Sequence, residues 1–217
     1  MKENILVVVI VIFTLNVNAQ NVKFGVKGGL NISSIYGSEN SDVESRYSFH
    51  IGGLAEVEIS EKLSFQPEVV FSSQGSKFNI SGEYFDLHGG VNSDFFNIES
   101  TSTLNYINIP LILKYYVFDG FSLEFGPQVG YLLSVKTETN HTVDGEIVSE
   151  ISKTKDGLNV IDFGVNIGLG YKLQNGIFFN SRFNLGLNAI NKKIEHQLYY
   201  KKHKNEVLQF SVGYFFN

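Results

Sequence analysis

The chain has 217 residues, enough for one domain of ordinary size, with a formal net charge of −5 and no cysteine. The mild acidity argues against nucleic acid as a partner, which would call for a basic stripe, and the lack of cysteine excludes disulfides, thiolate metal sites and lipidation at a mature N-terminal cysteine. Aromatic residues make up 14% of the chain beside 21 glycines and only 3 prolines, without helical periodicity, and this composition predicts an all-β closed sheet.

The first residues have the layout of a secretory signal peptide. Lys2 precedes the apolar run 5–15, and Val17-Asn18-Ala19 offers small residues at a cleavage point before Gln20. The apolar run, about 11 to 13 residues, is shorter than the roughly 20 that a membrane-spanning helix needs. We therefore predict a signal peptide over residues 1–19 and a single mature domain over residues 20–217.

Alternating apolar and polar residues predict eight strands, because successive side chains of a strand point to opposite faces. The pattern is clearest in the stretch 158–187, where Ile161 and Phe163 alternate with Asp162 and Gly164 before a turn and a second strand. The predicted strands, in chain order, cover residues 22–32, 47–59, 62–78, 104–117, 121–136, the two halves of 158–187, and 208–216.

The connections between these strands alternate strictly between long and short. The short ones contain Ser60-Glu61, Asp119-Gly120 and Asn175-Gly176, the last of which suits the positive-φ positions of a tight hairpin turn. The long ones are predicted as loops over residues 33–46, 79–103, 137–157 and 191–205. Long structureless loops are unusual in compact soluble domains, whereas short turns at one end and long loops at the other are typical of outer-membrane barrels. The strands also exceed the 9–11 tilted residues that cross a bilayer.

The polar face of the predicted sheet carries equal numbers of cationic and anionic side chains. A closed eight-stranded sheet leaves an interior just wide enough for side chains, and buried charges must be paired. A lipocalin-like barrel would turn its apolar face inward, which these charges do not suit. We predict an interior ion-pair network with an apolar exterior in lipid, and its members are Lys23, Lys27, Glu56, Glu58, Glu68, Lys114, Glu124, Asp162, Lys172 and Arg182.

Aromatic residues near the strand ends are candidates for interfacial girdles, although ordinary strand aromatics would look the same. These candidates are Tyr47, Tyr106, Tyr115, Tyr116, Phe118, Phe121, Tyr171 and Tyr214. A barrel plugged by ion pairs should conduct ions poorly, so the pattern favours a non-porin.

Several short motifs, taken in order, resemble one family of outer-membrane proteins. They are Gly25-Val26-Lys27-Gly28-Gly29-Leu30-Asn31, Leu63-Ser64-Phe65-Gln66-Pro67-Glu68 with Gln74-Gly75, Tyr106-Ile107-Asn108-Ile109-Pro110-Leu111, Gly126-Pro127-Gln128-Val129-Gly130-Tyr131-Leu132-Leu133, and Asp162-Phe163-Gly164 running into Gly168-Leu169-Gly170-Tyr171. Together they resemble the outer-membrane β-barrel ("porin family", PorT-like) proteins of Bacteroidetes over essentially the whole mature chain. The resemblance implies location and fold but no activity, and a role in secretion like that of PorT does not follow from it. The chain departs from the usual terminal aromatic by ending Phe215-Phe216-Asn217.

No spacing in the chain resembles a catalytic or metal-binding motif. A lipid-modifying enzyme would need a histidine near the outer leaflet, and His50, with Ser48 as a neighbour, is the candidate on the inward face. Loop pairs such as Asp86 with His88, or Asp94 with Glu99, lack the density of a metal motif. We predict no catalytic residue, no cofactor and no metal. The basic run 201–204 could contact anionic lipopolysaccharide or be a solvated loop.

The sequence thus predicts an eight-stranded antiparallel up-and-down transmembrane β-barrel of OmpA or OmpX size, in the outer membrane of a Bacteroidetes-type bacterium. We expect a non-enzymatic structural, adhesion or surface-recognition role through long extracellular loops. The alternatives are a small passive channel, a secretion-accessory barrel and a lipid-modifying enzyme. The expected partners are outer-membrane lipid and lipopolysaccharide, the barrel-assembly machinery and an unidentified extracellular ligand. We expect the chain to be a monomer.

Overall fold

The computed structural model describes residues 22–37, 43–85, 93–143, 146–192 and 202–216, and the predicted signal peptide lies outside these ranges. Regular structure in the described ranges is entirely β. The strands are β1 (Val22–Tyr36), β2 (Val43–Ser60), β3 (Leu63–Phe85), β4 (Ser93–Phe118), β5 (Phe121–Val143), β6 (Glu146–Ser152), β7 (Ile161–Lys172), β8 (Ile177–Gly186) and β9 (Lys204–Phe215). Among the described residues, none forms a helix long and apolar enough to cross a membrane.

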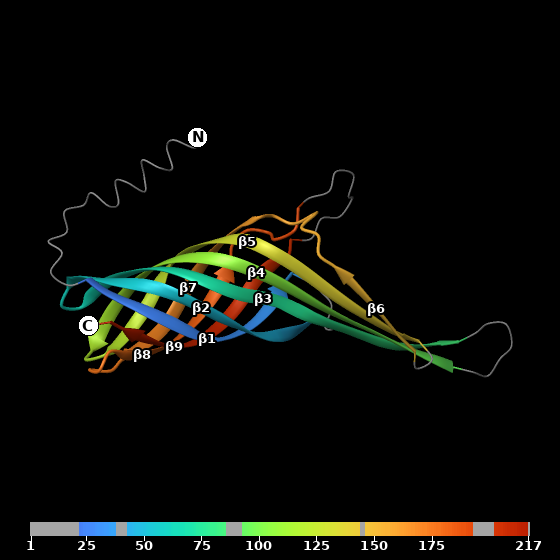
Figure 1. The fold of residues 1–217 in the computed structure, drawn as a ribbon, viewed down its shortest axis with the longest axis horizontal. Helices are drawn as coiled ribbons and strands as arrows, with labels where there is room; N and C mark the ends of the chain where they lie inside the picture. The colour runs from blue at the N-terminus through green and yellow to red at the C-terminus, as the bar shows by residue number, and fades with distance from the viewer. Residues whose placement is uncertain (1–21, 38–42, 86–92, 144–145, 193–201, 217) are drawn as a thin grey trace, which may run out of the picture.

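Eight of these strands close into an antiparallel ring, as the sequence predicts. Each strand pairs with its neighbour in the chain, except that β5 pairs directly with β7, and β1 closes the ring by pairing with β9. The ninth strand, β6, pairs with the outer end of β5 and stands outside the ring. Figure 1 shows the ring as a tilted barrel from which β3, β4, β5 and β6 extend far to one side.

Side chains in the ring alternate between a polar interior and an apolar exterior. On β7, Asp162, Gly164 and Asn166 are buried, whereas Phe163 and Ile167 are exposed. The same order holds around the ring, so its outer surface is an apolar belt. Exposed members of the belt include Phe24, Val26, Leu30, Ile51, Val69, Ile109, Leu113, Leu123, Phe125, Val129, Phe163, Ile167, Leu169, Phe179, Leu185, Phe210 and Val212.

The three predicted short turns lie at one end of the barrel, which we call the short-turn end. Gly120 has φ 78° and Gly176 has φ 89°, a left-handed conformation that favours glycine. Asn175 supports its turn by accepting a hydrogen bond from the backbone N–H of Ile177 onto its Oδ1 at 3.1 Å. The glycines and the asparagine of these turns therefore stabilise the tight connections at this end of the barrel.

The prediction of long loops at the other end is wrong for most of their length. The predicted loop 79–103 is largely strand, since β3 continues to Phe85 and β4 begins at Ser93. The predicted loop 137–157 contains the end of β5 and all of β6. The loop 33–46 is shortened by both flanking strands, and residues 193–201 of the loop 191–205 lie outside the described residues. The outer parts of β3, β4 and β5, from residues 77, 103 and 136 to their hairpin ends, together with β6, form what we call the projecting sheet (Figure 1).

The projecting sheet does not continue the apolar belt of the ring on β3 to β5, and its other face mixes apolar and polar residues. Its outward face, which continues the outer surface of the ring, carries Lys77, Asn79, Thr101, Glu99 and other polar residues on β3 to β5. On the face that continues the barrel interior, Ile80, Ile98, His141 and Val148 form one row across all four strands. The change occurs near Asn105, where the β4–β5 pairing has a register shift and the amide of Asn105 donates to Ser134 Oγ at 3.0 Å on the surface.

Two of the eight aromatic residues proposed for the girdles face inward instead. Tyr106 is fully buried in the part of the lumen nearest the projecting sheet, and Tyr116 lines the inside of the short-turn end. Both share strand parity with Lys114, so the alternation places them inside. Tyr47, Tyr115, Phe118, Tyr171 and Tyr214 are exposed on the outer surface.

Candidate functional site in the barrel lumen

The centre of the lumen holds a group of buried ion pairs. Arg182 bridges two carboxylates: its Nη1 lies 2.6 Å from Glu68 Oε1, and its Nε lies 2.5 Å from Glu124 Oε2. Lys27 Nζ lies 2.6 Å from the other oxygen of Glu68. All four side chains are almost completely buried. Because these charges are out of water, each depends on its partners for stabilisation.

A second group of ion pairs lies nearer the short-turn end. Lys114 Nζ lies 3.0 Å from Glu56 Oε2, and Lys172 Nζ lies 2.9 Å from Glu56 Oε1. Lys114 is also 3.7 Å from Glu124, which connects this group to the first. Tyr116 donates its hydroxyl to Glu56 Oε1 at 2.8 Å. The two groups therefore form one continuous chain of alternating charges.

Strand alternation and glycines explain why these long side chains fit. Gly168 and Gly170 face inward on β7 opposite Arg182 and Asn180 of β8, and the absence of their side chains leaves the space that Arg182 and Glu124 occupy. A methyl group on Gly168 would lie 2.7 Å from Cγ of Arg182. Glycine on one strand thus accommodates the ionic side chains of its neighbours.

Three of the ten predicted network residues, Lys23, Glu58 and Asp162, lie apart from this chain of charges. Lys23 pairs with Glu58 at 2.6 Å, but both side chains are partly exposed at the short-turn end. Asp162 is buried higher in the lumen, and the ion pairs between described residues do not include it. It accepts a hydrogen bond from the amide of Asn205 at 3.0 Å instead.

Amide side chains complete the network, and the sequence prediction missed them. Gln66 accepts from Lys114 at 3.2 Å through Oε1 and donates to Glu68 at 2.6 Å through Nε2. Its position on β3 shares the parity of Glu68, so strand alternation could have identified it. Such hydrogen bonds satisfy the remaining oxygens and protons of the buried ions.

Above the ion pairs lies a neutral polar layer centred on His50. Its Nδ1 is 2.8 Å from Asn31 Oδ1, and its Nε2 is 2.7 Å from Ser211 Oγ. Asn31 also donates to Ser72 Oγ at 3.0 Å and accepts from Gln209 at 3.0 Å. Ser211, His50 and Asn31 thus form a chain of hydrogen bonds that resembles a hydrolase triad. His50, however, is buried and faces the lumen, away from the lipid-facing surface.

Apolar side chains close the lumen on both sides of these polar layers. Towards the end from which the projecting sheet extends, the buried cluster consists of Leu104, Tyr106, Leu132, Val135 and Ile190. Towards the short-turn end, the rings of Phe178 and Phe215 pack against each other at a tilt, with 4.8 Å between their centroids. The ammonium of Lys114 lies 6.0 and 5.8 Å from these centroids. The cations therefore contact aromatic faces as well as carboxylates.

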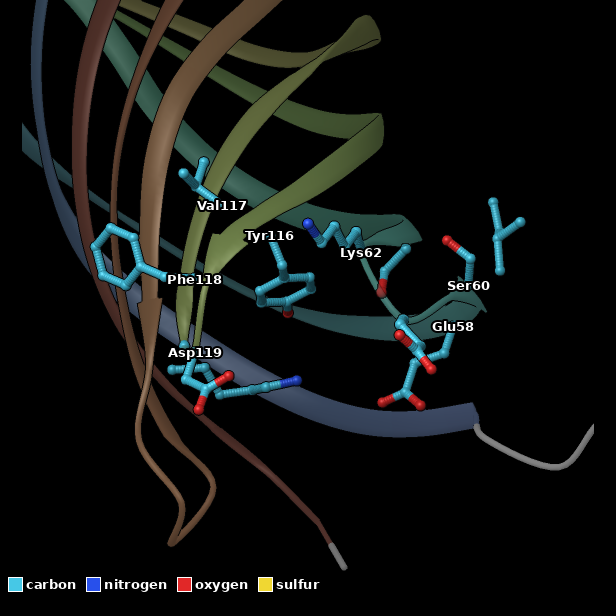
Figure 2. Close-up of a pocket in the computed structure, with 12 residues that line it drawn as sticks. Glu58, Ser60, Lys62, Tyr116, Val117, Phe118 and Asp119 are labelled. Carbon is cyan, nitrogen blue, oxygen red and sulfur yellow. The ribbon is translucent and has the colours of Figure 1, made fainter.

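A cavity of about 620 Å³ opens at the short-turn end. Figure 2 shows residues that line this opening, among them Tyr116, Lys62 and Glu58. The cavity stops at the Glu56 ion pairs, because Lys172 and Tyr116 line it and both contact Glu56. It is a polar mouth rather than a passage through the barrel.

A metal-binding group of three or more histidine, aspartate or glutamate side chains is not present among the described residues. Asp86 and His88, which the sequence offered as a loop pair, lie outside them, and so does the basic run 201–204 in part.

A family model for the outer membrane protein beta-barrel domain matches residues 18–192, which is most of the chain. The chain belongs to this outer-membrane β-barrel family. The match agrees with the closed ring and its apolar belt, and it places the protein in the outer membrane. The finer resemblance to PorT-like proteins of Bacteroidetes stays a prediction. No curated protein matches this chain.

Solved structures of small outer-membrane barrels resemble the fold distantly. Neisserial surface protein A (NspA) is 13% identical, with a TM-score of 0.42 over 91% of this chain and 100% of the other. Ail, the attachment invasion locus protein of Yersinia pestis, is 10% identical, with a TM-score of 0.41 over 91% and 100%. The outer membrane protease OmpT from Escherichia coli is 13% identical, with a TM-score of 0.35 over 94% and 99%. These likenesses concern the fold alone.

Proposed function

We propose that this protein is a non-enzymatic surface-recognition barrel whose projecting sheet binds an extracellular ligand. The observation that carries the proposal is the sheet itself, which extends β3, β4 and β5 beyond the apolar belt and adds β6. Within the described chain, β3 beyond Phe78 pairs only with β4, and β6 pairs only with β5. Unpaired strand edges are templates for an added strand, so this surface suits recognition by backbone pairing.

The β6 edge has the side chains that such pairing requires. All seven residues of Glu146–Ser152 are exposed, and Ile147 is 69% exposed. The strand contains no proline, and its β-branched residues Ile147, Val148 and Ile151 favour extended structure. Edge strands of monomeric proteins are usually protected, so an unprotected edge supports a role in binding.

The finer identity follows the sequence. We propose that a Bacteroidetes-type bacterium exports the chain with the signal peptide 1–19, that the barrel-assembly machinery inserts it as a monomer, and that the projecting sheet lies outside the cell. The apolar belt would then contact outer-membrane lipid and lipopolysaccharide. Both chain ends of the barrel lie near the short-turn end, which would face the periplasm (Figure 1).

The experiment compares the full chain with a variant in which residues 78–100 and 138–151 are each replaced by a short turn. Both are expressed in a bacterial outer membrane, and a heat-dependent mobility shift verifies that each barrel has folded. Cells are then applied to a panel of immobilised extracellular-matrix proteins and to a glycan array. We expect the full chain to bind at least one probe about tenfold more strongly than the trimmed variant. Equal binding by both would refute the role of the projecting sheet.

A matched pair of variants tests the edge itself. Ile147→Lys with Ile151→Lys adds charge to the edge strand, whereas Thr101→Lys with Thr103→Lys adds the same charge to the outward face of β4, which is paired on both sides. Edge pairing predicts that only the first double variant loses binding. Equal loss in both would indicate general electrostatics instead.

The channel alternative has one observation in its favour, the cavity at the short-turn end. The ion pairs above it, the Phe178–Phe215 pair and the apolar cluster around Leu104 support a closed lumen. We expect no single-channel conductance above background in a planar bilayer. Steady conductance would favour the passive channel, and lost export of cargo on gene deletion would favour the secretion-accessory role.

A further inference from the structure

Asp162 is an unusual carboxylate in this lumen. Glu56, Glu68 and Glu124 each lie within 3.0 Å of a cationic nitrogen, but Asp162 has no ion pair among the described residues. Only 6% of Asp162 is exposed, and its Oδ1 has no hydrogen-bond partner in the described structure. Burying an unpaired carboxylate is costly, so this site calls for a positive charge or a proton.

Two further acceptor oxygens, on the strands that neighbour β7 and its pairing partner, are also without partners in the described structure. They are Oδ1 of Asn184 and Oδ1 of Asn205, and both side chains are at least nine-tenths buried. The orientation of each amide follows from the hydrogen bonds that its Nδ2 group donates. Asn205 donates through Nδ2 to Asp162 Oδ2 at 3.0 Å and to the Tyr106 hydroxyl at 3.2 Å, and Asn184 donates through Nδ2 to Asn166 Oδ1 at 3.2 Å. The unpaired atoms are therefore oxygens rather than N–H groups.

These residues surround a glycine pair on three adjacent strands. Gly164 of β7 lies opposite Gly186 of β8. Asp162 is two residues from this glycine pair on one side, and Asn184 is two residues from it on the other side, level with Asn166. Asn205 of β9 lies beside Gly186, and its backbone oxygen would be 2.8 Å from a methyl group there. A methyl group on Gly164 would lie 2.9 Å from Nδ2 and 3.1 Å from Oδ1 of Asn184. The glycines thus leave open the space around which the amides and the carboxylate gather.

A second set of unpaired polar atoms lower in the lumen provides a contrast. Ser122 Oγ, Glu124 Oε1, both amide atoms of Asn180 and Nη2 of Arg182 lie on β5 and β8 on either side of Gly168 and Gly170. This set mixes donors with acceptors, and its charges are already paired, so water molecules would satisfy it. The unpaired atoms of the Asp162 set are acceptors only, and an ionised Asp162 has no cation beside it among the described residues, which water would not supply.

We propose that Asp162, Asn184 and Asn205 bind a hard monovalent cation of the sodium class. Carboxylate and amide oxygens are the ligands that hard cations prefer, and a single carboxylate neutralises a single positive charge in a medium of low dielectric constant. The apolar cluster around Leu104 and Leu132 lies above the site and the ion pairs lie below it, so the cation is enclosed as the barrel folds. The site is a structural element of the barrel, and it does not depend on the proposed recognition role.

The test is refolding of the purified mature chain into detergent in sodium chloride or in N-methylglucamine chloride at equal ionic strength. The folded-to-unfolded ratio is measured at a fixed urea concentration by the gel mobility shift and by circular dichroism. We expect sodium to raise this ratio about tenfold for the wild type, the mass-action effect of a ligand at roughly ten times its Kd. Asp162→Asn should lose the sodium effect, whereas Asp119→Asn, which changes an exposed carboxylate in a turn, should keep it.

The outcomes separate the cation site from its rivals. An Asp162→Asn variant as stable as the wild type in both salts would overturn the proposal and indicate a protonated carboxyl group. A wild type insensitive to sodium would also overturn it, and stabilisation by calcium alone would refute the monovalent assignment. If Asp162→Asn does not fold, Asn184→Ala retains the carboxylate and should weaken the sodium effect. In crystals grown with thallium, anomalous density beside Asp162 Oδ1 would support the site directly.

Discussion

The ring and the projecting sheet share three strands but order their side chains in different ways. In the ring, outward residues of β4 and β5 such as Ile109, Leu113 and Phe125 are apolar and exposed. Beyond Asn105, the outward residues of the same strands are Thr101, Glu99 and Glu138. The β4–β5 ladder has a register shift between Asn105 and Tyr106 and resumes beyond it. The change in the outward side chains is the one expected for a ring within a membrane and a sheet in water.

The inward faces differ for the same reason. The lumen of the ring is narrow and holds ions that must pair with one another, as Arg182 does with Glu68 and Glu124. The corresponding face of the projecting sheet encloses nothing, and its row from Ile80 to Val148 is only partly covered. Polar side chains are therefore buried in one region and apolar ones are left accessible in the other. Each of the following variants should affect one region far more than the other.

The largest effect is expected from Arg182→Met in the ring. Arg182 is 1% exposed, and its removal leaves Glu68 and Glu124 buried without their shared cation. Breaking a buried pair in this way costs about 3–5 kcal/mol. Urea unfolding in detergent measures the loss, with Lys23→Met as the control because the Lys23–Glu58 pair is partly exposed and should cost less than about 1 kcal/mol. Equal losses in the two variants would mean that the lumen ions are solvated.

A somewhat smaller effect is expected when a cation is placed on the outward face. Ile167→Arg introduces charge at a position of β7 that is 62% exposed within the apolar belt, and it should destabilise the barrel by about 2–4 kcal/mol in lipid vesicles. Thr101→Arg makes the same change on the outward face of the projecting sheet and should be nearly neutral. The comparison is made by refolding equilibria in vesicles. If Ile167→Arg left the folding stability unchanged, that face of the barrel would be in water.

The ring could be predicted from sequence because it imposes a period of two on every strand. Ile161 to Tyr171 alternates with polar and glycine residues since one side meets lipid and the other meets the lumen. The same rule placed nine of the ten predicted charges in ion pairs of the structure. Which charges meet was not predictable, because Arg182 and Glu68 are 114 residues apart and their contact depends on strand register and tilt.

The projecting sheet could not be recognised by that rule. Residues 79–103 are rich in Ser, Thr and Asn, because water reaches much of both faces and no strong apolar alternation is required. The pairs Ser100 with Thr139 and Ser102 with Thr137, whose hydroxyl groups interact at 3.1 and 3.4 Å, resemble loop composition when read in sequence alone. Asp162 shows the other limit: its strand parity placed it in the lumen, but its height along the barrel axis separates it from the cations.

An intermediate loss of stability is expected from a glycine substitution on β1, compared with one on its partner β2. Gly29 faces the neighbouring backbone of β9, and a methyl group there would overlap the carbonyl oxygen of Phe210. Gly29→Ala should therefore destabilise the barrel by about 1–3 kcal/mol. Gly53→Ala is the control, since its methyl group would find its nearest neighbour, the Gly25 carbonyl oxygen, at 3.9 Å. Urea unfolding of both variants in detergent measures the difference, and equal midpoints would contradict close backbone packing at Gly29.

The smallest effect on the barrel is expected from Ile98→Asn in the projecting sheet. Ile98 lies between Ile80 and His141, so the change weakens the row from Ile80 to Val148, which is apolar except for His141. Because few contacts connect this row to the lumen, the sheet should open more often while the unfolding midpoint of the ring shifts by less than about 0.5 kcal/mol. Limited proteolysis in detergent measures the local opening, and cleavage within residues 93–103 and 136–152 should accelerate several-fold while the ring fragment persists. Glu99→Ala, on the other face of the same strand, should leave the cleavage rate unchanged. A loss of ring stability comparable to that of Arg182→Met would mean that ring and sheet unfold as one unit, and the sheet would then be a support for the barrel rather than a separate binding element.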